Sequence, residues 1–373
     1  MVDPLPSHPK TWLLFGHKTG DNNQLLALVE TLGWPFCVKR LRYRPYELLV
    51  GRLGAWLGGI DLERSDPLEP PWPDLVLTAG RRNEAAALWI KKQAARAGKE
   101  VKVVHVGRPW APLDRFDLIL TTPQYELPLD ENVFYHRLPL HRLTREELQM
   151  EGEKWRSRLG ANLLTVLVGG SSGPYIFDAH AAERLAEGVE AVAKREGLEP
   201  VVITSRRTPE EACRVLEGWF AQVFRFGRGE NPYLGALALA KVIVVTGDSI
   251  SMLSEACFTG KPVLIFPFGH GRLAMHPERE VVPRPRTLLD PERRRALLSD
   301  LALRFAPRRL RRDVRRIHRL LIGEGRASWL GEPLPKPPPP LDERPDLARK
   351  VAERLNWPLP PGQKPKSRPP SQA

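Results

Sequence analysis

The chain has 373 residues, with 57 Lys and Arg against 44 Asp and Glu, a formal charge of +13. This length suffices for two α/β domains with a core each. Its three cysteines, Cys37, Cys213 and Cys257, are far apart and lack metal-ligand spacing, which argues against a zinc site and predicts a reducing compartment. No signal peptide is seen before Lys10 and no apolar run is long enough to cross a bilayer, so we expect a cytoplasmic protein, at most peripheral at the inner face of the membrane.

The basic excess is concentrated in the last part of the chain. From Gly271 to Ala373 there are 24 Lys and Arg against 12 Asp and Glu, which leaves the first 270 residues close to neutral. A basic segment favours nucleic acid, an anionic membrane surface or an acidic ligand. No DNA-binding or RNA-binding motif accompanies the charge, so we expect no nucleic-acid partner.

The first strand is predicted at Thr11 to Phe15 and the first helix at Gln24 to Leu32, because apolar residues recur there on one face. The glycine-containing loop between them suits a phosphate or a hydroxyl-rich ligand, although an ordinary βα loop is an equal alternative. Two of its polar side chains, His17 and Asp21, are candidate catalytic bases, with a helix cap or a surface position as the alternative. Further candidates for the ligand-binding surface are Lys18, Gly20, Asn23 and Gln24.

The apolar stretch Leu48 to Ile60 is too short to span a membrane, and core packing is favoured over contact with lipid. A strand follows at Leu75 to Thr78 and a helix at Glu84 to Ala97. Arg81, at the carboxyl end of that strand, is placed to meet a phosphate, with a solvated surface position as the alternative. Further strands are predicted at 101–106, 117–120 and 133–137.

A second series of strands and helices follows the polar segment His141 to Gly160, which is predicted to be an interdomain helix or a linker. Strands are predicted at 163–168, 201–204, 222–226, 242–245 and 263–266, and a helix at 179–196. The alternation predicts a second parallel sheet. Small residues after the first of these strands, Gly169 to Ser172, would allow a diphosphate to approach the backbone, with the positive end of helix 179–196 turned toward it.

The segment Leu239 to Pro267 has the clearest strand–turn–helix–strand pattern in the chain. Its polar turn, Thr246 to Ser249, lies at the carboxyl end of a predicted strand, where ligands bind in open α/β sheets. The alternative is that Asp248 and Ser249 only cap the following helix. His270 follows the last clear strand. A lone histidine between glycines is more often a loop residue than a catalyst, but its location keeps His270 among the candidates.

The C-terminal region is predicted to contain one basic amphipathic helix over Arg304 to Leu321, with the arginines of Arg308 to Arg319 off its apolar face. Such a helix suits an anionic membrane surface; packing on the first domain is an equal alternative. The proline-rich tail from residue 326 is expected to be disordered.

Several ordered motifs resemble the mitochondrial-fission ELM (elongated mitochondria) family over roughly residues 11 to 270. They are GDSISMLSEA followed by TGKPV, Lys18-Thr19-Gly20 with Asn23-Gln24, Pro73-Asp74-Leu75 leading to Ala79-Gly80-Arg81-Arg82, Val168-Gly169-Gly170-Ser171-Ser172, Thr204-Ser205-Arg206-Arg207 and Asn231-Pro232-Tyr233. The resemblance implies an α/β protein with two Rossmann-like domains facing a cleft, of the glycosyltransferase-B type.

The resemblance also implies a domain plan. An acceptor-side domain would span residues 1–145, a linker 146–160 and a nucleotide-sugar domain 161–325, followed by the tail at 326–373. The Gly-Gly-Ser loop is also similar to the donor loop of the N-acetylglucosamine transferase that makes the last peptidoglycan lipid precursor.

The expected function is metal-independent transfer from a nucleotide-sugar to a cell-envelope or lipid-linked acceptor, without a cofactor. By resemblance Glu255 would hold the nucleotide ribose. The remaining donor-binding residues would be Gly169, Gly170, Ser171, Ser172, Ser205, Arg206, Gly247, Asp248, Ser249, Ser251 and Met252. Two alternatives stay open: a membrane-associated scaffold without catalysis, as the plant members imply, and a sugar-nucleotide epimerase, whose expected pair of acidic residues is not identifiable.

Overall fold

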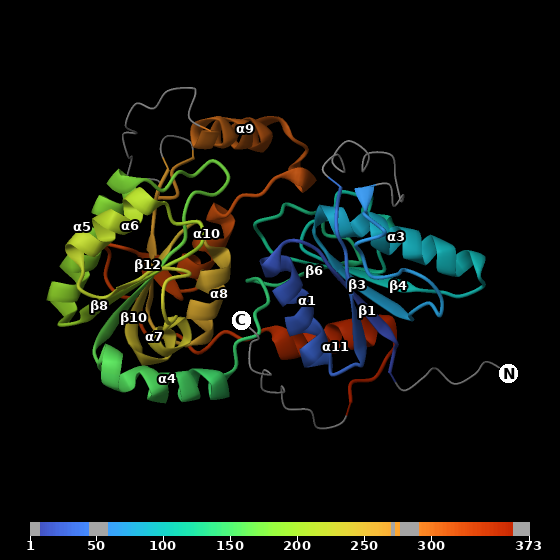
Figure 1. Cartoon of the computed structure of the whole chain (residues 1–373), viewed down its shortest axis with the longest axis horizontal. Helices are drawn as coiled ribbons and strands as arrows, with labels where there is room; N and C mark the ends of the chain where they lie inside the picture. Colours follow the sequence, from blue (N-terminus) through green and yellow to red (C-terminus); the bar gives the residue numbers. More distant parts are fainter. Residues whose placement is uncertain (1–7, 45–58, 270–272, 277–290, 361–373) are drawn as a thin grey trace. The chain divides into compact units, whose positions relative to one another are not determined.

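The computed structural model describes residues 8–44, 59–269, 273–276 and 291–360. The chain forms two compact units (Figure 1). Unit 1 runs to Arg142 and also takes in Arg308–Leu310 and the C-terminal part from Glu343. Unit 2 comprises Leu143–Pro307 and Arg311–Asp342.

Unit 1 is built on a six-stranded parallel sheet in the order β2-β1-β3-β4-β5-β6. Its elements are β1 (Thr11–Phe15), α1 (Thr19–Leu32), β2 (Phe36–Arg40), β3 (Leu75–Ala79), α3 (Gly80–Arg96), β4 (Lys102–Val106), η2 (Leu113–Arg115), β5 (Leu118–Thr121), β6 (Val133–Tyr135), η4 (Arg308–Leu310) and α11 (Arg344–Leu355). The chain moves from β1 to β2 on one side and then to β3 on the other. The direction of winding therefore reverses between β1 and β3.

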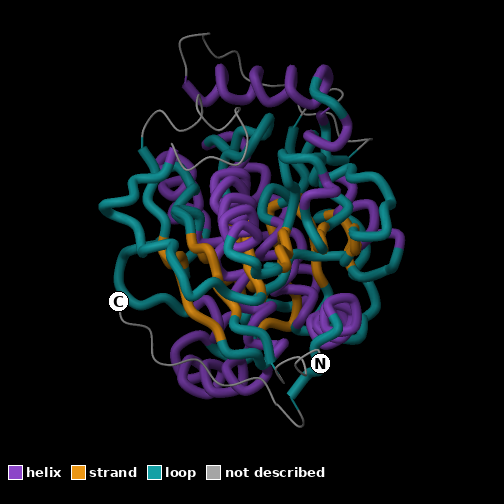
Figure 2. Tube along the Cα trace, turned by 90° about the vertical axis from the view of Figure 1, so that its right-hand side faces the viewer, coloured by secondary structure: helices purple, strands orange, loops and turns teal. Residues whose placement is uncertain are grey.

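Alternating side chains on the strands of unit 1 fill two cores, one on each face of the sheet. On β1, Leu13 packs with residues of α1 and α11, whereas Trp12 and Leu14 pack with residues of α3. This is the period of two that a strand buried on both faces requires. Helices on both sides of the strands are visible in Figure 2.

The predicted disordered tail is wrong for the described part of 326–373, because residues 327–329 form β12 of unit 2 and Arg344–Leu355 form α11. Leu347, Val351 and Leu355 of α11 join the core that α1 covers. The Trp34 indole donates a hydrogen bond to the Pro358 carbonyl at 3.0 Å. The helix forms because its apolar face has a partner about 320 residues earlier in the chain, which no local pattern reveals.

Unit 2 contains a second six-stranded parallel sheet, in the order β12-β11-β10-β7-β8-β9. Its elements are α4 (Arg145–Leu159), β7 (Leu163–Val168), α5 (Ala179–Glu196), β8 (Glu199–Thr204), α6 (Glu210–Trp219), β9 (Val223–Phe224), α7 (Tyr233–Leu239), β10 (Ala240–Thr246), α8 (Ile250–Phe258), β11 (Val263–Phe266), α9 (Pro291–Phe305), α10 (Arg315–Gly323) and β12 (Ala327–Trp329). Here the winding reverses between β7 and β10.

Of the two predictions for the polar segment, an interdomain helix or a linker, the helix is confirmed: α4 covers most of 146–160 and belongs to unit 2. Thr144 and Glu147 form a capping box at its start, each satisfying a backbone N–H of the other. Its Trp155 is buried and packs so closely on Gly235 of α7 that a Cβ there would lie 2.5 Å from the indole. The polar composition suggested a connector, but one buried face is enough to dock the helix.

The single helix predicted over Arg304 to Leu321 is also wrong. The segment is divided into the end of α9, the short η4 and α10. Ile317 and Leu321 are buried, and α10 packs on β12 inside unit 2. The arginines of Arg308 to Arg319 therefore do not lie on one helix; Arg308–Leu310 belongs to unit 1, and contact of these arginines with an anionic membrane stays a prediction.

Most predicted strands are confirmed to within two residues, and the α/β class with two Rossmann-like units is confirmed. The cleft between the units stays a prediction. Residues 48–58 of the apolar stretch and His270 lie outside the described residues. No helix in the described part of the chain is both long and apolar enough to cross a bilayer.

Candidate functional site

The reversal of winding gives each sheet one preferred place for a ligand. In open α/β sheets ligands bind beyond the carboxyl ends of the strands, where neighbouring strands lead away in opposite directions. In unit 1 that place lies after β1 and β3, and in unit 2 it lies after β7 and β10. We call these the unit 1 edge and the unit 2 edge.

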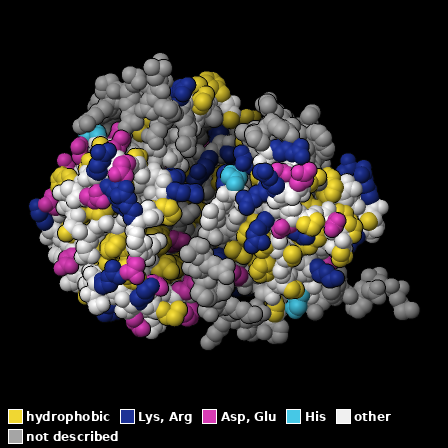
Figure 3. Space-filling view, viewed as in Figure 1, with side chains coloured by type: hydrophobic (Ala, Val, Ile, Leu, Met, Phe, Trp, Pro, Cys, Tyr) yellow, Lys and Arg dark blue, Asp and Glu magenta, His cyan; other side chains and the backbone are white. Residues whose placement is uncertain are grey.

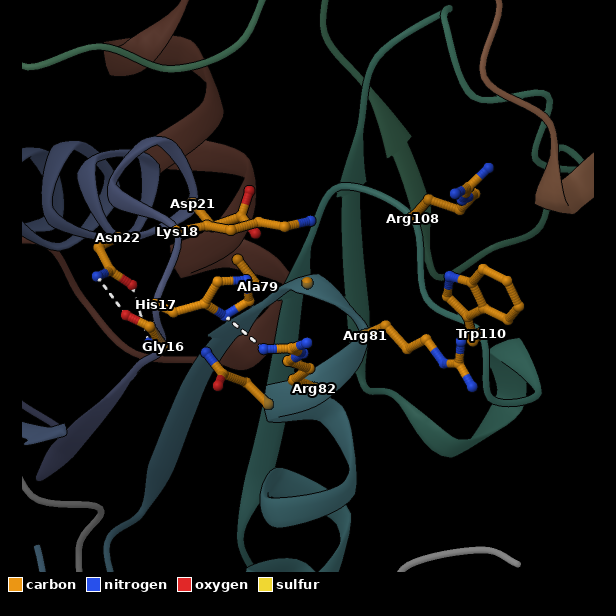
Figure 4. A pocket seen from close by; sticks show the side chains of 12 residues that line it. Gly16, His17, Lys18, Asp21, Asn22, Ala79, Arg81, Arg82, Arg108 and Trp110 are labelled. Carbon is orange, nitrogen blue, oxygen red and sulfur yellow. Dashed lines mark hydrogen bonds between the residues drawn. The ribbon is translucent and has the colours of Figure 1, made fainter. Parts of the chain in front are cut away.

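The unit 1 edge is open. A pocket of about 270 Å³ lies between the loops that follow β1, β3 and β4 (Figure 4). It is lined by Gly16, His17, Lys18, Asp21, Asn22, Ala79, Gly80, Arg81, Arg82, Asn83, Arg108 and Trp110.

Two asparagines shape the loop after β1. The Asn22 side chain accepts a hydrogen bond from the Gly16 N–H and donates one to the Gly16 carbonyl, both at 3.0 Å. The buried Asn83 amide donates to the Leu14 carbonyl at 2.7 Å and accepts from the Tyr43 hydroxyl. Because both backbone groups of Gly16 are bound, the position of the next two residues, His17 and Lys18, is restrained.

A carboxylate and a glycine meet at the rim of the pocket. Gly80 begins α3 with a φ of +75°, a conformation that favours glycine. A Cβ at this position would lie 2.6 Å from Asp21 Oδ2. The glycine therefore allows the Asp21 carboxylate of α1 to rest against the start of α3.

The His17 imidazole is held by its neighbour Arg82. Arg82 Nη1 lies 3.3 Å from His17 Nδ1, and a guanidinium can only donate, so Nδ1 is the acceptor and Nε2 carries the proton. Partial burial lowers the pKa of His17, and the charges of Arg82 and Lys18 lower it further, against the opposing effect of Asp21. At neutral pH this ring is thus an uncharged hydrogen-bond donor.

The opposite wall of the pocket is cationic and aromatic. The Arg81 guanidinium lies 4.3 Å from the centre of the Trp110 ring, and that of Arg108 lies 5.6 Å from it. The buried Glu84 carboxylate accepts the Trp110 backbone N–H at 2.8 Å. This bond fixes the loop that carries both Arg108 and Trp110.

Four of the seven sequence-predicted residues of unit 1 line this pocket: His17, Lys18, Asp21 and Arg81. Gly20, Asn23 and Gln24 do not; they lie in α1, which begins five residues earlier than predicted and contributes Asp21 and Asn22 to the pocket instead. The sequence analysis missed Arg82, Asn83, Arg108 and Trp110 as site residues. The last two follow β4, and the same strand-end argument would have found them.

The unit 2 edge is filled by the protein's own carboxylate. The Asp248 side chain is fully buried and accepts hydrogen bonds from the Gly170 N–H at 3.1 Å and the Thr246 hydroxyl at 2.8 Å. Arg207 Nη1 forms an ion pair with its Oδ2 at 2.7 Å. Burial raises the pKa of Asp248, and the three donors act in the opposite direction. Asp248 therefore does not cap the following helix.

The two glycines after β7 are required by this packing. A Cβ on Gly169 would lie 2.4 Å from the Asp248 carboxylate, and one on Gly170 would lie 2.0 Å from the Arg207 carbonyl oxygen. The Ser205 hydroxyl donates to the Gly169 carbonyl at 2.7 Å and joins this cluster. Close contact between three loops is thus enough to explain the Gly-Gly pair without a bound diphosphate.

Two neighbouring arginines at this edge differ in their contacts. Arg207, which the sequence analysis did not select, holds Asp248 and also donates weakly to the Gly170 and Ser171 carbonyls at 3.4 Å. Arg206, which it did select, is exposed; the Arg207 side chain is itself 39% exposed, so its ion pair with Asp248, and not its burial, sets it apart. Both guanidiniums are adjacent in the sequence, and only the folded chain distinguishes the structural one from the solvated one.

The rest of the Gly-Gly-Ser loop folds back on itself. Ser172 pairs with Tyr175 through two backbone hydrogen bonds, and the Ser171 hydroxyl accepts the Phe177 N–H. The Asp178 side chain caps α5 by accepting the Ala181 N–H at 2.9 Å. A carboxylate already occupies the place at the start of α5 where an anion was predicted.

Helix α8, in contrast, has no side-chain cap: its N-cap Ser249 makes no capping hydrogen bond. Ser251 in the first turn is exposed, Met252 is half-buried, and the half-buried Glu255 lies one turn beyond Ser251 on the same face. The Tyr233 hydroxyl donates to Glu255 Oε2. Burial raises the pKa of Tyr233, and the Glu255 charge adds to this effect.

A buried histidine supports the turn that precedes α8. His318 of α10 donates from Nε2 to the Gly247 carbonyl at 2.7 Å. Burial lowers the pKa of His318 to about 4, so the ring is neutral above that pH. A Cβ on Gly247 would lie 2.5 Å from Met275 Sδ and 3.1 Å from the His318 ring, which explains the glycine.

Two parallel sheets, each with loops gathered where its winding reverses, define an α/β protein of two Rossmann-like units, as in the glycosyltransferase-B type. Solved structures similar to this chain include a UDP-GlcNAc 2-epimerase from Neisseria meningitidis bound to UDP-GlcNAc, at 13% identity over 93% of this chain and 99% of that chain, with a TM-score of 0.40. MurG from Acinetobacter baumannii matches at 14% identity over 84% and 95%, with a TM-score of 0.37.

The chain belongs to the mitochondrial fission ELM1 family, whose model matches residues 19–277. The uncharacterized protein RP120 of Rickettsia prowazekii is 24% identical over 68% of this chain and 82% of its own length. The mitochondrial fission protein ELM1 of Arabidopsis thaliana is 27% identical over 60% of this chain. The match spans 58% of the length of that plant relative.

Proposed function

We propose that this protein binds a nucleotide-activated sugar at the start of α8 in unit 2 and transfers the sugar to an acceptor. The observation that carries the proposal is the uncapped start of α8 at the unit 2 edge, with a hydroxyl and a carboxylate on one of its faces. The first N–H groups of a helix lack intrahelical acceptors and favour an anion such as a diphosphate.

The carboxylate of Glu255 supports the nucleotide part of the proposal. Five residues separate it from Ile250, which corresponds to about 7.5 Å along a helix. That is comparable to the separation of a nucleotide's ribose and its diphosphate. A carboxylate accepts several hydrogen bonds, so Glu255 can bind ribose hydroxyls while it accepts from Tyr233. The buried Asp248 cluster then serves as a rigid floor beneath the ligand.

In the transfer step an acceptor hydroxyl oxygen forms a bond to the anomeric carbon. The bond from that carbon to the diphosphate breaks, and the nucleoside diphosphate leaves with the electron pair. The hydroxyl proton goes to a base. Of the two predicted bases we favour the Asp21 carboxylate, because His17 Nδ1 already accepts from Arg82 and Nε2 carries the proton.

Nucleotide binding is tested by thermal shift with UDP-, GDP-, CMP- and dTDP-sugars, on the protein and on Glu255→Gln. A ligand of the folded state raises the melting temperature by mass action, so one nucleotide class should shift the wild type and not the variant. Glu153→Gln, at an exposed position on α4, is the matched control and should behave as wild type. A shift that survives in the double variant of Glu255→Gln and Arg81→Gln, in which the cationic unit 1 pocket is also weakened, or no shift at millimolar ligand, contradicts the proposed site.

A membrane-associated scaffold is the second candidate, and α9 favours it. Leu297, Leu301 and Phe305 recur every four residues on one face and are 43%, 48% and 79% exposed, and Leu298 beside them is 67% exposed. Hydrophobic side chains are visible over α9 in Figure 3. An exposed apolar face flanked by arginines is typical of helices that lie on anionic membranes.

Vesicle co-sedimentation tests this second candidate. Binding to anionic vesicles should fall strongly when Leu298 and Phe305 are both replaced by Glu. Leu129→Glu, at a leucine that is 87% exposed in unit 1, is the control and should leave binding unchanged. Equal binding by the double variant and the control would exclude α9 as the membrane contact.

A further inference from the structure

The unit 1 pocket has a charge balance that calls for an anion. Lys18, Arg81, Arg82 and Arg108 line it, and Asp21 is the one carboxylate among the lining residues. The four cations therefore exceed the acidic groups by three. The first 270 residues are nearly neutral as a whole, so this local excess is not a consequence of overall composition.

The cations converge from three different elements. Lys18 and Asp21 lie at the start of α1, Arg81 and Arg82 in the first turn of α3, and Arg108 in the loop after β4 (Figure 4). Because the fold brings these cations close together around a small volume, they repel one another. A bound anion would relieve this repulsion.

Each guanidinium is oriented by a neighbour. Arg81 stacks on Trp110, and Arg82 is held between the His17 ring and the Tyr43 ring, whose centre is 5.5 Å away. A planar guanidinium whose position is restrained matches two oxygens of a phosphate with little loss of side-chain freedom. The protonated Nε2 of His17 adds a neutral donor at the same pocket.

Two helices also begin at this pocket. α1 and α3 start at Thr19 and Gly80, and neither N-cap residue, Lys18 or Ala79, makes a side-chain capping hydrogen bond. Their first N–H groups supply further donors beside the cations. The pocket volume of about 270 Å³ is near the lower end for ligand sites and suits one phosphate group with a small attached moiety.

We propose that the unit 1 pocket binds the phosphate or diphosphate group of a phosphorylated ligand, through Lys18, Arg81 and Arg82. Trp110 provides an apolar surface for the group to which the phosphate is attached. The inference goes beyond the nucleotide site, because it concerns another unit, and it holds whether or not the chain transfers a sugar. The phosphate can come from a small soluble ester or from a lipid headgroup.

Isothermal titration at low salt tests the proposal with pyrophosphate and with glucose 1-phosphate, and vesicles containing phosphatidic acid or only phosphatidylcholine test the lipid source. Lys18→Gln and Arg81→Gln should each weaken phosphate binding roughly tenfold, the usual effect of losing one charge-assisted hydrogen bond. Arg64→Gln, at an arginine side chain that is 81% exposed elsewhere in unit 1, is the matched control and should bind as wild type.

The two sources give different patterns. Saturable binding of the soluble phosphates indicates a free ester, and binding only to phosphatidic acid vesicles, lost in the same two variants, indicates a lipid headgroup. No saturable binding of any probe at low salt, or equal affinity in the two variants and Arg64→Gln, overturns the proposal. Glu255→Gln should leave phosphate binding at this pocket unchanged, so failure here is distinguishable from failure of the nucleotide site.

Discussion

The edges of the two sheets have equivalent topology and different contents. In unit 1 the Asp21 carboxylate rests against Gly80 at the rim of an open pocket of about 270 Å³ whose cations face the cavity. In unit 2 the Asp248 carboxylate is fully buried between Gly170 and Arg207. At one edge several cations line an open pocket, and at the other a buried carboxylate pairs with Arg207.

The difference teaches that a glycine-rich strand end has two distinct physical meanings. At Gly169 and Gly170 the missing Cβ atoms admit other parts of the same protein, and the result is a rigid cluster. At Gly80 the missing Cβ likewise admits one carboxylate, that of Asp21, but the loops around it line an open pocket. We expect a ligand in the pocket at the unit 1 edge. At the unit 2 edge we expect one only beside the filled cluster, where the first N–H groups of α8 supply hydrogen-bond donors.

The largest expected effect comes from breaking the filled edge. Asp248→Ala leaves the buried Gly170 N–H and Thr246 hydroxyl without their acceptor, and Arg207, whose side chain is 39% exposed, without its ion pair. Each buried donor left without a partner costs about 1–3 kcal/mol. Urea unfolding should show this loss. Asp346→Ala, at an aspartate side chain that is 69% exposed on α11, should change stability by less than about 0.5 kcal/mol, and an equal loss in both variants would refute the comparison.

His318, which supports the Gly247 turn at the unit 2 edge, should make the stability of the protein depend on pH in the acidic range. The pKa of His318 is about 4 in the folded protein and 6.5 in an unfolded chain. Between these pH values the unfolded chain binds a proton that the folded chain does not, so the free energy of unfolding falls as the pH is lowered. The full loss is about 3 kcal/mol, complete near pH 4 and absent above 6.5.

His318→Gln retains a donor for the Gly247 carbonyl and cannot take up this proton. Unfolding measured from pH 7 to pH 4 should therefore have a shallower pH dependence in the variant, even if its stability at pH 7 is lower. The buried His105, whose pKa burial lowers to about 3, and the buried His136, whose pKa burial also lowers, remain in both proteins and contribute to the residual slope. Identical slopes would show that His318 is not the group responsible.

The smallest expected effect is the difference in stability between alanine at Gly80 and alanine at Gly98. This difference measures the cost of the close contact with Asp21 apart from the cost of backbone strain. Gly80 and Gly98 have nearly the same φ, +75° and +74°, but only at Gly80 would an added Cβ have a neighbour, Asp21, within 4 Å. Alanine at Gly98 should cost about 1 kcal/mol through backbone strain alone. Gly80→Ala should cost about 1 kcal/mol more, because the Asp21 carboxylate must also move. Thermal unfolding that shows equal losses would mean that Asp21 moves aside freely.

Most of the fold was accessible from local pattern. Strands such as Thr11–Phe15 and Val263–Phe266 were predicted with correct ends, because buried parallel strands are short apolar runs between turn residues. Helix starts were less accurate: α1 and α3 begin at Thr19 and Gly80, four or five residues before the predicted ones. Their first turns are polar because they line a pocket, so the apolar periodicity begins only one turn later.

The candidate site was predicted in part. The strand-end rule correctly brought His17, Asp21 and Arg81 together, since carboxyl ends of parallel strands meet at one edge. It did not distinguish Arg206 from Arg207, which are chemically identical neighbours. It also placed an anion at the start of α5, where Asp178 is the cap.

By itself the sequence determined the α/β class, the two parallel sheets and the family, because these depend on local periodicity and on ordered motifs. The tertiary structure decided which strand end is open and which is filled, since that depends on contacts such as Asp248 with Gly170, 78 positions apart. It also decided that α11 completes the core of unit 1. Long-range burial stabilises such contacts, and no local pattern records it.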